Sequence, residues 1–242
     1  MLSKSRVKYI QSLGHKKFRD EEGFYIAEGP KIVKELINEA PALIDTVYGL
    51  KDWINDNRNL SGQVEMIEIT PIELEKISQL SVPNGVLAIV KKNEEAIIET
   101  VNTITIVLDT LQDPGNLGTI IRTADWFGID QIVCSNDSAD NYNPKVVQAT
   151  MGSIVRVKVI YKDLQSWLQQ QKVKIYAAAL NGKDVSTLQQ IKEGIIIIGN
   201  ESKGISPEIM EMAHEKITIT RKGKAESLNA AVAAGIIMSE FV

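Results

Sequence analysis

The chain has 242 residues, of which 44% are hydrophobic and 24% are charged, and its formal net charge at pH 7 is −4. These fractions are typical of soluble globular proteins and exclude a disordered chain, and the length allows one or two domains. The single cysteine, Cys134, excludes an intramolecular disulfide and a cysteine-based zinc site, and it fits a reducing compartment. His15 and His214 are far apart in the sequence, so no metal site is expected.

The sequence carries no signal for secretion or for a membrane. Polar residues follow the N-terminal Met1-Leu2 pair, and the longest strongly apolar run, residues 195–198, is far shorter than the ~20 residues that span a bilayer. A cytoplasmic location is therefore expected. The sequence pI of about 5.4 argues against a uniformly basic RNA-coating protein, but it allows a local basic face that captures phosphate.

The first part of the chain predicts alternating helices and strands. Its first twenty residues combine apolar residues at helical spacing with six cations, which form either a solvated helix face or an arm that contacts phosphate: Lys4, Arg6, Lys8, Lys16, Lys17 and Arg19. Strands are predicted at 24–27, 45–50, 64–69 and 86–90, and helices at 31–40, around Trp53 and at 71–79. This alternation predicts a small α/β domain over residues 1–92.

A charged segment then breaks the apolar periodicity, which predicts a linker at 93–103. Residues 104–242 alternate again, with strands predicted at 104–108, 131–134, 155–159, 174–178, 195–198 and 216–219 and helices near 117–127, 144–151, 163–170, 206–213 and 227–241. The strands are almost continuously apolar. They therefore predict a parallel sheet covered by helices on both faces.

Ligands of parallel α/β sheets bind beyond the carboxyl ends of the strands, so the turns after the strands are candidate sites. The first notable turn contains a Pro-Gly pair and leads into a helix, where the amide of Asn116 is placed to act as a cap. Arg122 lies further along this otherwise apolar helix and needs an anion, which Asp125 or Asp109 could supply in a purely structural pair. The glycines lack the spacing of a dinucleotide-binding fingerprint or of a P-loop.

The second turn, residues 199–204, follows the four isoleucines of a predicted core strand. Glu201 lies between Gly199 and Gly204, where the backbone could approach a ligand closely. An ordinary strand-to-helix loop would also use glycine and asparagine. The carboxylate just beyond a core strand favours a functional interpretation.

The third turn precedes the last helix, for which Ser227 is a natural N-cap. Alanines early in that helix permit another helix to approach closely. Arg221, Lys222 and Lys224 make the preceding loop basic. A capped helix that follows a solvated loop explains these residues without any function.

Together, in this order and spacing, the three turns resemble the sequence motifs of the SpoU (TrmH-like) RNA 2′-O-ribose methyltransferases. The three motifs correspond in order to residues 116–124, 199–204 and 227–233, with further likeness at 143–145 and 151–153. The resemblance covers residues 104–242. The first part of the chain, with Phe24, Glu28 and Gly29, is similar to the substrate-binding domain of many members, which is related to an RNA-binding ribosomal protein fold.

The resemblance implies a parallel sheet whose C-terminal segment threads a trefoil knot that holds S-adenosylmethionine. It places the cofactor against Gly199, Asn200, Ile219 and Leu228, mostly on backbone groups. Members of the family are homodimers with the active site close to the subunit interface, so a homodimer is expected, without a metal and without a membrane.

The implied reaction is attack of a ribose 2′-hydroxyl, a very weak acid, on a sulfonium methyl group. Arg122 is implied as the catalytic arginine. Because a guanidinium group is a poor general base and a good bidentate donor, we expect it to hold the phosphate beside the target ribose and to polarise the hydroxyl. Asn116 and Asn229 would orient Arg122 and the ribose. Glu201 would fix donors around them or around the cofactor, and Ser227 would lend its hydroxyl to the same network.

The expected substrate is rRNA, or otherwise tRNA, and the six cations near the N-terminus are expected to bind it. A catalytically inactive RNA-binding or ribosome-assembly module is the main alternative, and the presence of all motif residues counts against it. A nucleotide-dependent enzyme of the Rossmann type is disfavoured by its missing glycine fingerprint. Two positions depart from the family pattern: Thr220 stands where proline is frequent, and Gln148 where arginine is common.

Overall fold

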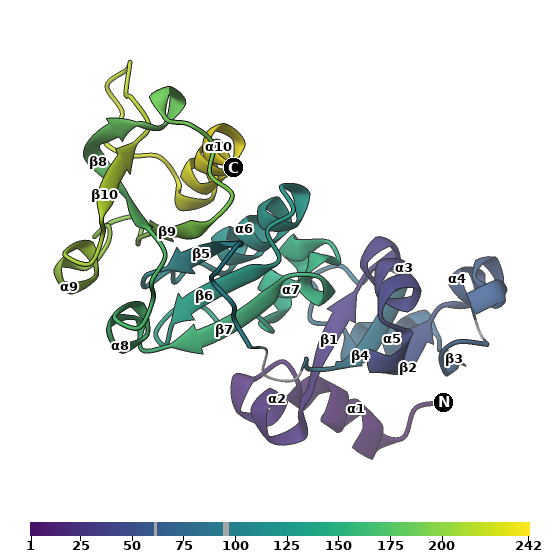
Figure 1. The fold of residues 1–242 in the computed structure, drawn as a ribbon. Coiled ribbons are helices and arrows are strands. Elements are labelled where there is room, and N and C mark those ends of the chain that lie inside the picture. The colour runs from purple at the N-terminus through teal and green to yellow at the C-terminus, as the bar shows by residue number, and fades with distance from the viewer. Residues whose placement is uncertain (61, 94–96) are drawn as a thin grey trace. The chain divides into compact units, whose positions relative to one another are not determined.

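The computed structural model describes residues 1–60, 62–93 and 97–242 (Figure 1). The chain forms two compact units, of which one contains Met1–Glu94 with Asp140–Val155 and the other contains Glu95–Ala139 with Arg156–Val242. None of the described helices is long and apolar enough to cross a membrane. The predicted linker at 93–103 stays a prediction: residues 94–96 lie outside the described residues, and residues 97–103 form neither a helix nor a strand.

The first unit is built on a mixed four-stranded sheet. In spatial order the strands are β1 (Phe24–Glu28), β4 (Val86–Lys91), β2 (Ile44–Gly49) and β3 (Met66–Glu68). β4 runs antiparallel to both of its neighbours, whereas β3 is parallel to β2. The helices are α1 (Lys4–Ser12), α2 (Lys16–Glu22), α3 (Pro30–Glu39), α4 (Lys51–Asp56) and α5 (Pro71–Ile77).

Burial on both faces of this sheet follows from the alternation of side chains along β4. Ala88 and Val90 belong to the core that contains α3, whereas Leu87 and Ile89 pack with α1 and α5. Proline begins α3 and α5, as is favoured where the missing N–H has no partner. Helix α2 was not predicted separately. It ends at Gly23, whose φ of 75° lies in the left-handed region that favours glycine.

Residues 140–155 complete the core of the first unit. Helix α7 (Pro144–Thr150) and the turn after it contribute Val147 and Ile154 to the core around Tyr25. The rings of Tyr25 and Tyr142 stack with their centroids 4.8 Å apart. Arg19, of which only 2% is exposed, forms an ion pair of 2.5 Å with Asp140. Arg19 therefore ties α2 to this distant part of the sequence, which no local pattern predicts.

The second unit contains the predicted parallel sheet, which confirms the fold class. In spatial order its six parallel strands are β10 (Glu215–Thr218), β8 (Ile175–Asp184), β9 (Gly194–Ile198), β5 (Ile104–Leu108), β6 (Gln131–Ser135) and β7 (Lys158–Lys162). Its helices are α6 (Pro114–Trp126), α8 (Leu164–Leu168), α9 (Pro207–Met210) and α10 (Ala230–Phe241). β7 begins later than predicted because residues 153–155 form a 3₁₀ turn.

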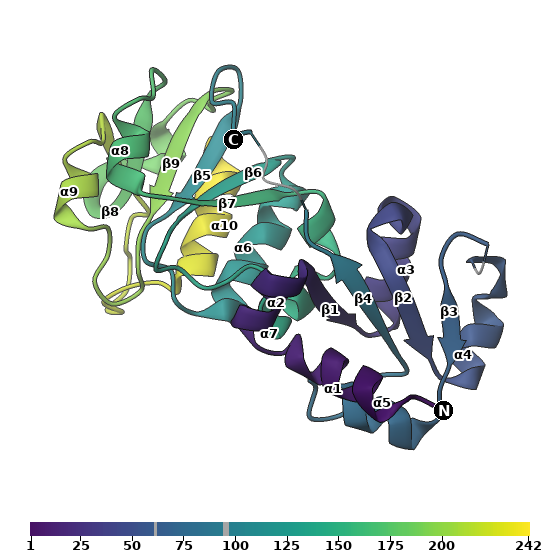
Figure 2. The same ribbon diagram turned by 90° about the horizontal axis from the view of Figure 1, so that it is seen from below.

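Helices cover both faces of the parallel sheet. Val107 and Ile197 pack on the face that α8 and α9 cover. Tyr176 points to the opposite face, where its ring meets that of Phe241 in α10 at 4.8 Å, and α10 packs beside α6 (Figure 2). Cys134 is buried in β6, and this burial raises the pKa of its thiol.

Arg19→Met is expected to lower the free energy of unfolding of the first unit by about 3–5 kcal/mol, because it leaves the largely buried carboxylate of Asp140 without its partner. We would follow urea unfolding by the fluorescence of Trp53, with Trp126 and Trp167 replaced by phenylalanine in reference and variant alike. Lys17→Met is the matched control, since Lys17 pairs with Glu21 at 3.8 Å on the surface and such pairs contribute less than about 1 kcal/mol. Equal effects of the two changes would contradict the role of Arg19.

Candidate active site

The three turns selected from the sequence meet at the carboxyl end of the parallel sheet in the second unit. A cavity of about 850 Å³ opens there between the loop after β9, the segment from β10 to α10 and the outer part of β8. All four residues expected to hold a cofactor line this cavity: Gly199, Asn200, Ile219 and Leu228. Glu201 and Ser227 line it as well.

A chain of side-chain hydrogen bonds joins the three turns. The amide of Asn229 donates to Oδ1 of Asn116 at 2.9 Å, and the amide of Asn116 donates to Oε1 of Glu201 at 2.5 Å. Oδ1 of Asn229 in turn accepts from the backbone N–H groups of Ala231 and Val232. Because backbone N–H groups can only donate, their bonds to Asn229 fix the orientation of its amide, and the bond from Asn229 then fixes that of Asn116. The carboxylate of Glu201 is therefore the final acceptor.

These contacts correct two predictions about helix caps. Asn116 does not cap α6; Asp113 does, by accepting from the backbone N–H of Asn116 at 2.7 Å. Ser227 does not cap α10, because that helix begins at Ala230 and its N-cap is Asn229. Since the caps are supplied by other residues, the side chain of Asn116 is available to bind Glu201.

The loop after β9 is folded tightly on itself. Its backbone pairs Asn200 with Gly204, and Oδ1 of Asn200 accepts from the N–H groups of Ser202 and Lys203. A Cβ on Gly199 would stand 2.2 Å from the carbonyl carbon of Gly204, so only glycine fits there without a backbone shift. Asn200 was expected to hold a cofactor, but its side chain forms hydrogen bonds with the backbone of the protein itself.

The sequence interpretation missed the residues that anchor this loop from below. The Nδ2 of Asn200 donates to the carbonyl of Thr110 at 2.9 Å, and the N–H of Thr110 donates to Ser135 Oγ at 2.8 Å. The buried carboxylate of Asp109 accepts from both the N–H and the hydroxyl of Ser206, each at 2.7 Å. Thr110 has a φ of 57°, which costs about 1–2 kcal/mol for a non-glycine residue. The sequence signal that could have indicated this anchor is the polar pair Asp109-Thr110, which directly follows the buried strand β5.

Arg122 lies apart from this network. It is exposed on α6, does not line the cavity, and forms no hydrogen bond or ion pair within residues 1–60, 62–93 and 97–242. The structural pair considered from the sequence is absent from this described part, since Asp125 pairs with Arg156 at 2.8 Å and Asp109 is occupied by Ser206. Asn116 and Asn229 were expected to orient Arg122, but in the part of the chain that the structure describes neither residue forms a hydrogen bond with it.

The six N-terminal cations divide into two groups. Four are exposed on α1 and α2: Lys4, Lys8, Lys16 and Lys17. Arg6 instead forms an ion pair with Asp45 at 3.0 Å and donates to the Tyr48 hydroxyl at 2.6 Å. Arg19 is buried and paired with Asp140, so its predicted contact with RNA is wrong. Burial behind its own helix removes the Arg19 guanidinium from solvent.

Two protein families match different parts of the chain. Residues 103–239 match the SpoU rRNA Methylase family, and residues 4–88 match the MRM3-like substrate binding domain. Among the described residues, no cluster of histidine, cysteine, aspartate or glutamate could hold a metal ion.

Individual relatives cover almost the whole chain. The 23S rRNA (guanosine(2553)-2′-O)-methyltransferase RlmP of Bacillus subtilis is 30% identical over 96% of this chain and 94% of its own length. A TrmH-family protein from Porphyromonas gingivalis has a TM-score of 0.88 and 33% identity, covering 100% of this chain and 98% of that one. The AdoMet-bound rRNA methyltransferase from Sinorhizobium meliloti has a TM-score of 0.84 and 28% identity, covering 99% and 95%.

The family model spans more than half of the chain, and it includes the two turns that line the cavity and the first turn, which Asn116 joins to them by hydrogen bonds. The resemblance inferred from those turns is therefore confirmed, and the chain belongs to the SpoU rRNA methylase family.

Proposed function

We propose that this protein transfers a methyl group from S-adenosylmethionine to a ribose 2′-hydroxyl of RNA, with rRNA as the substrate. The observation that carries the proposal is the joining of Asn116, Glu201 and Asn229 by hydrogen bonds beside the cavity at the end of the sheet. Relatives named as rRNA 2′-O-methyltransferases along nearly the full chain support the choice of reaction and substrate. An inactive RNA-binding module would not need this network.

The cavity fits the cofactor that the family uses. Its volume of about 850 Å³ lies within the range of about 300–1,000 Å³ that is usual for small-molecule sites. Gly199 lines the cavity, and a Cβ there would collide with the backbone of Gly204, so glycine is needed for the shape of this wall. Gly199, Ile219 and Leu228 would hold the cofactor, which supplies an electrophilic methyl group on its sulfonium. Asn200 would shape the loop rather than contact the ligand with its amide.

The side chains beside the cavity would position the ribose. Asn116 and Asn229 already use one amide hydrogen each, which leaves the second hydrogen of each amide for a ribose oxygen. Glu201 holds Asn116 in that orientation, and Ser227 offers an exposed hydroxyl at the cavity wall. Such fixed donors reduce the entropy that is lost when the hydroxyl is aligned with the methyl group.

The catalytic arginine would act across a homodimer. Arg122 lies on the exposed side of α6, where the neighbouring Trp126 is 84% exposed, and Val232 on the adjacent α10 is 51% exposed. Large exposed apolar side chains on two packed helices are typical of a protein interface. We place the second copy against this face, so that Arg122 of one protomer reaches the cavity of its partner. There it would hold the phosphate next to the target ribose.

The first unit would supply RNA affinity through Lys4, Lys8, Lys16 and Lys17, which are exposed on its first two helices. The proposal keeps the predicted division into an RNA-binding part at 1–92, a linker at 93–103 and a methyltransferase part at 104–242, with the knot that the family implies.

Because residues 140–155 pack in the first unit, deletion of residues 1–92 would expose part of its core. Substitutions are therefore the cleaner experiment. The bacterial rRNA methyltransferase among the relatives supports a cytoplasmic location as part of the proposal.

Gly199→Ala is expected to abolish binding of S-adenosylhomocysteine in a calorimetric titration, because the new methyl group displaces the loop that borders the cavity. Gly223→Ala is the matched control. Gly223 lies in the facing loop, and a Cβ there meets nothing within 4 Å. Saturable binding by the wild type at about one ligand per chain, retained in the control and lost in Gly199→Ala, supports the site. Unchanged binding in Gly199→Ala would place the cofactor elsewhere.

Arg122→Ala is expected to abolish methyl transfer and to leave binding of S-adenosylhomocysteine near that of the wild type, because Arg122 does not line the cavity of its own protomer and would hold the RNA phosphate rather than the cofactor. Mixed dimers test the action across subunits. An equal mixture of the Arg122→Ala and Gly199→Ala chains should recover about a quarter of the wild-type activity, since half of the dimers are mixed and each has one complete site. No recovery after verified exchange of subunits would show that Arg122 serves its own cavity.

The reaction itself is tested by mapping ribose methylation in rRNA and tRNA by mass spectrometry, in strains with and without the protein. One 2′-O-methyl group should disappear from rRNA on deletion and return with the wild-type chain, but not with Arg122→Ala. Loss of a tRNA methyl group instead would change the substrate. Loss of none from either RNA would refute the proposed activity.

A further inference from the structure

One charged feature near the cavity has no part in the network described above. The segment between β10 and α10 carries Arg221, Lys222 and Lys224 with one nearby carboxylate, Glu226, whereas the chain as a whole has a net charge of −4. Every residue from Thr220 to Asn229 is exposed. The basic loop, defined here as residues 221–224, is therefore a local positive surface on an acidic protein.

The basic loop borders the cavity, and its lysines are free to bind an anion. Arg221 and Lys222 line the cavity, and the Nη1 of Arg221 donates to the carbonyl of Ala225 at 3.2 Å. In the part of the chain that the structure describes, neither Lys222 nor Lys224 forms an ion pair within 4 Å. Arg221 thus braces the loop, and the two lysines extend from it.

The nearest carboxylate of the neighbouring strand is already occupied. Asp184 accepts from the hydroxyl of Thr220 and from Ser186, and these hydrogen bonds, with a smaller contribution from the charge of Lys222, hold the pKa of Asp184 below its usual value. Its attraction for Lys222 acts at longer range than a direct ion pair, so it does not neutralise the loop.

An RNA substrate would bring phosphate groups to the mouth of the cavity, beside the basic loop. A ribose 2′-hydroxyl is flanked by the phosphodiester groups of its own nucleotide, so a hydroxyl that enters the cavity brings phosphates to the cavity mouth. Several nearby cations do not strengthen the binding of a cofactor that carries a positive sulfonium. Each of them raises the affinity for RNA, because RNA releases counterions when its phosphates are neutralised. The exposure of the whole segment also favours a partner that approaches from solvent.

We propose that the basic loop binds the RNA backbone beside the target nucleotide, as a second phosphate-binding surface in addition to the lysines of α1 and α2. This inference rests on the proposed function. Lys222 and Lys224 each neutralise one phosphate, and Arg221 keeps the loop in place through Ala225.

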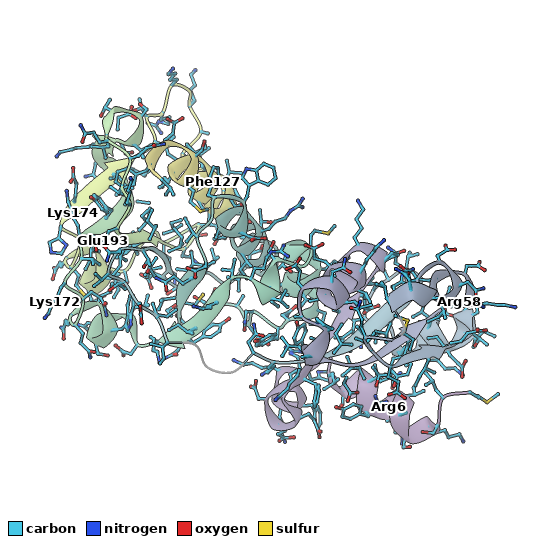
Figure 3. The ribbon with its side chains drawn as sticks, turned by 45° about the vertical axis from the view of Figure 1, so that its right-hand side comes forward. Arg6, Arg58, Phe127, Lys172, Lys174 and Glu193 are labelled. Atoms are coloured by element: carbon cyan, nitrogen blue, oxygen red, sulfur yellow. The ribbon has the colours of Figure 1, made fainter. Side chains whose placement is uncertain are left out.

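The test compares Lys222→Gln/Lys224→Gln with Lys172→Gln/Lys192→Gln. The control lysines are exposed and lie just before β8 and β9. They are therefore at the end of the sheet where these strands begin, opposite the cavity. Figure 3 shows Lys172 close to Lys174 and Glu193 at that edge. Binding of a fluorescein-labelled single-stranded RNA of mixed sequence would be measured by anisotropy over a series of salt concentrations. Calorimetry with S-adenosylhomocysteine would be run on the same samples.

The loop variant should bind this RNA about tenfold more weakly at physiological salt, and the slope of log affinity against log salt should fall by about 1.4, since each phosphate contact to a single strand contributes about 0.7. Its affinity for S-adenosylhomocysteine and its melting temperature should equal those of the control. An unchanged salt slope overturns the inference, as does a matching loss of cofactor affinity, which would assign the lysines to the cofactor. A wild-type chain that binds neither ligand would instead refute the proposed function.

Discussion

The hydrogen-bond chain from Asn229 through Asn116 to Glu201 is the interaction on which the site depends. Its geometry is possible because parallel strands end at one edge, which brings the start of α6, the loop after β9 and the start of α10 together. The N-cap of α10 anchors the first amide, and that anchor determines the orientation of the second. Helix capping, a local structural device, thereby aligns side chains from three distant parts of the sequence and presents them to the cavity.

One wall of the cavity, the loop after β9, is held in place for a related reason. Polar groups of the loop after β9 are satisfied inside the protein, by Thr110 beneath Asn200 and by Asp109 beneath Ser206. A buried carboxylate is tolerated because it accepts two hydrogen bonds from Ser206. The loop therefore keeps its shape before any ligand binds, so little entropy is lost on binding. The left-handed conformation of Thr110 is a local cost of this arrangement.

Cations serve two separate purposes in this chain. Arg19 is buried against Asp140 and stabilises the first unit, whereas the lysines of α1, α2 and the basic loop are exposed, and among those of α1 and α2 Lys17 makes a surface pair with Glu21. Arginine suits the first purpose because its planar group donates in fixed directions, here to both Asp140 and the carbonyl of Leu13. Lysine suits the second because its flexible ammonium follows a phosphate without a fixed geometry. The proposed RNA binding would thus use local positive surfaces of an acidic protein.

The parallel sheet, the family and the turns that meet at the site could be predicted from the sequence, because apolar strands, glycine turns and polar residues at strand ends are local patterns. The three-dimensional structure was needed to show that Asn229 and Asp113, rather than Ser227 and Asn116, cap their helices. It also decided that residues 140–155 pack in the first unit and that Arg19 is buried. The physical reason is that a side chain's partner depends on long-range packing. Spacing along the chain indicates which residues can reach a site, but the packing of distant elements selects the bonds they form.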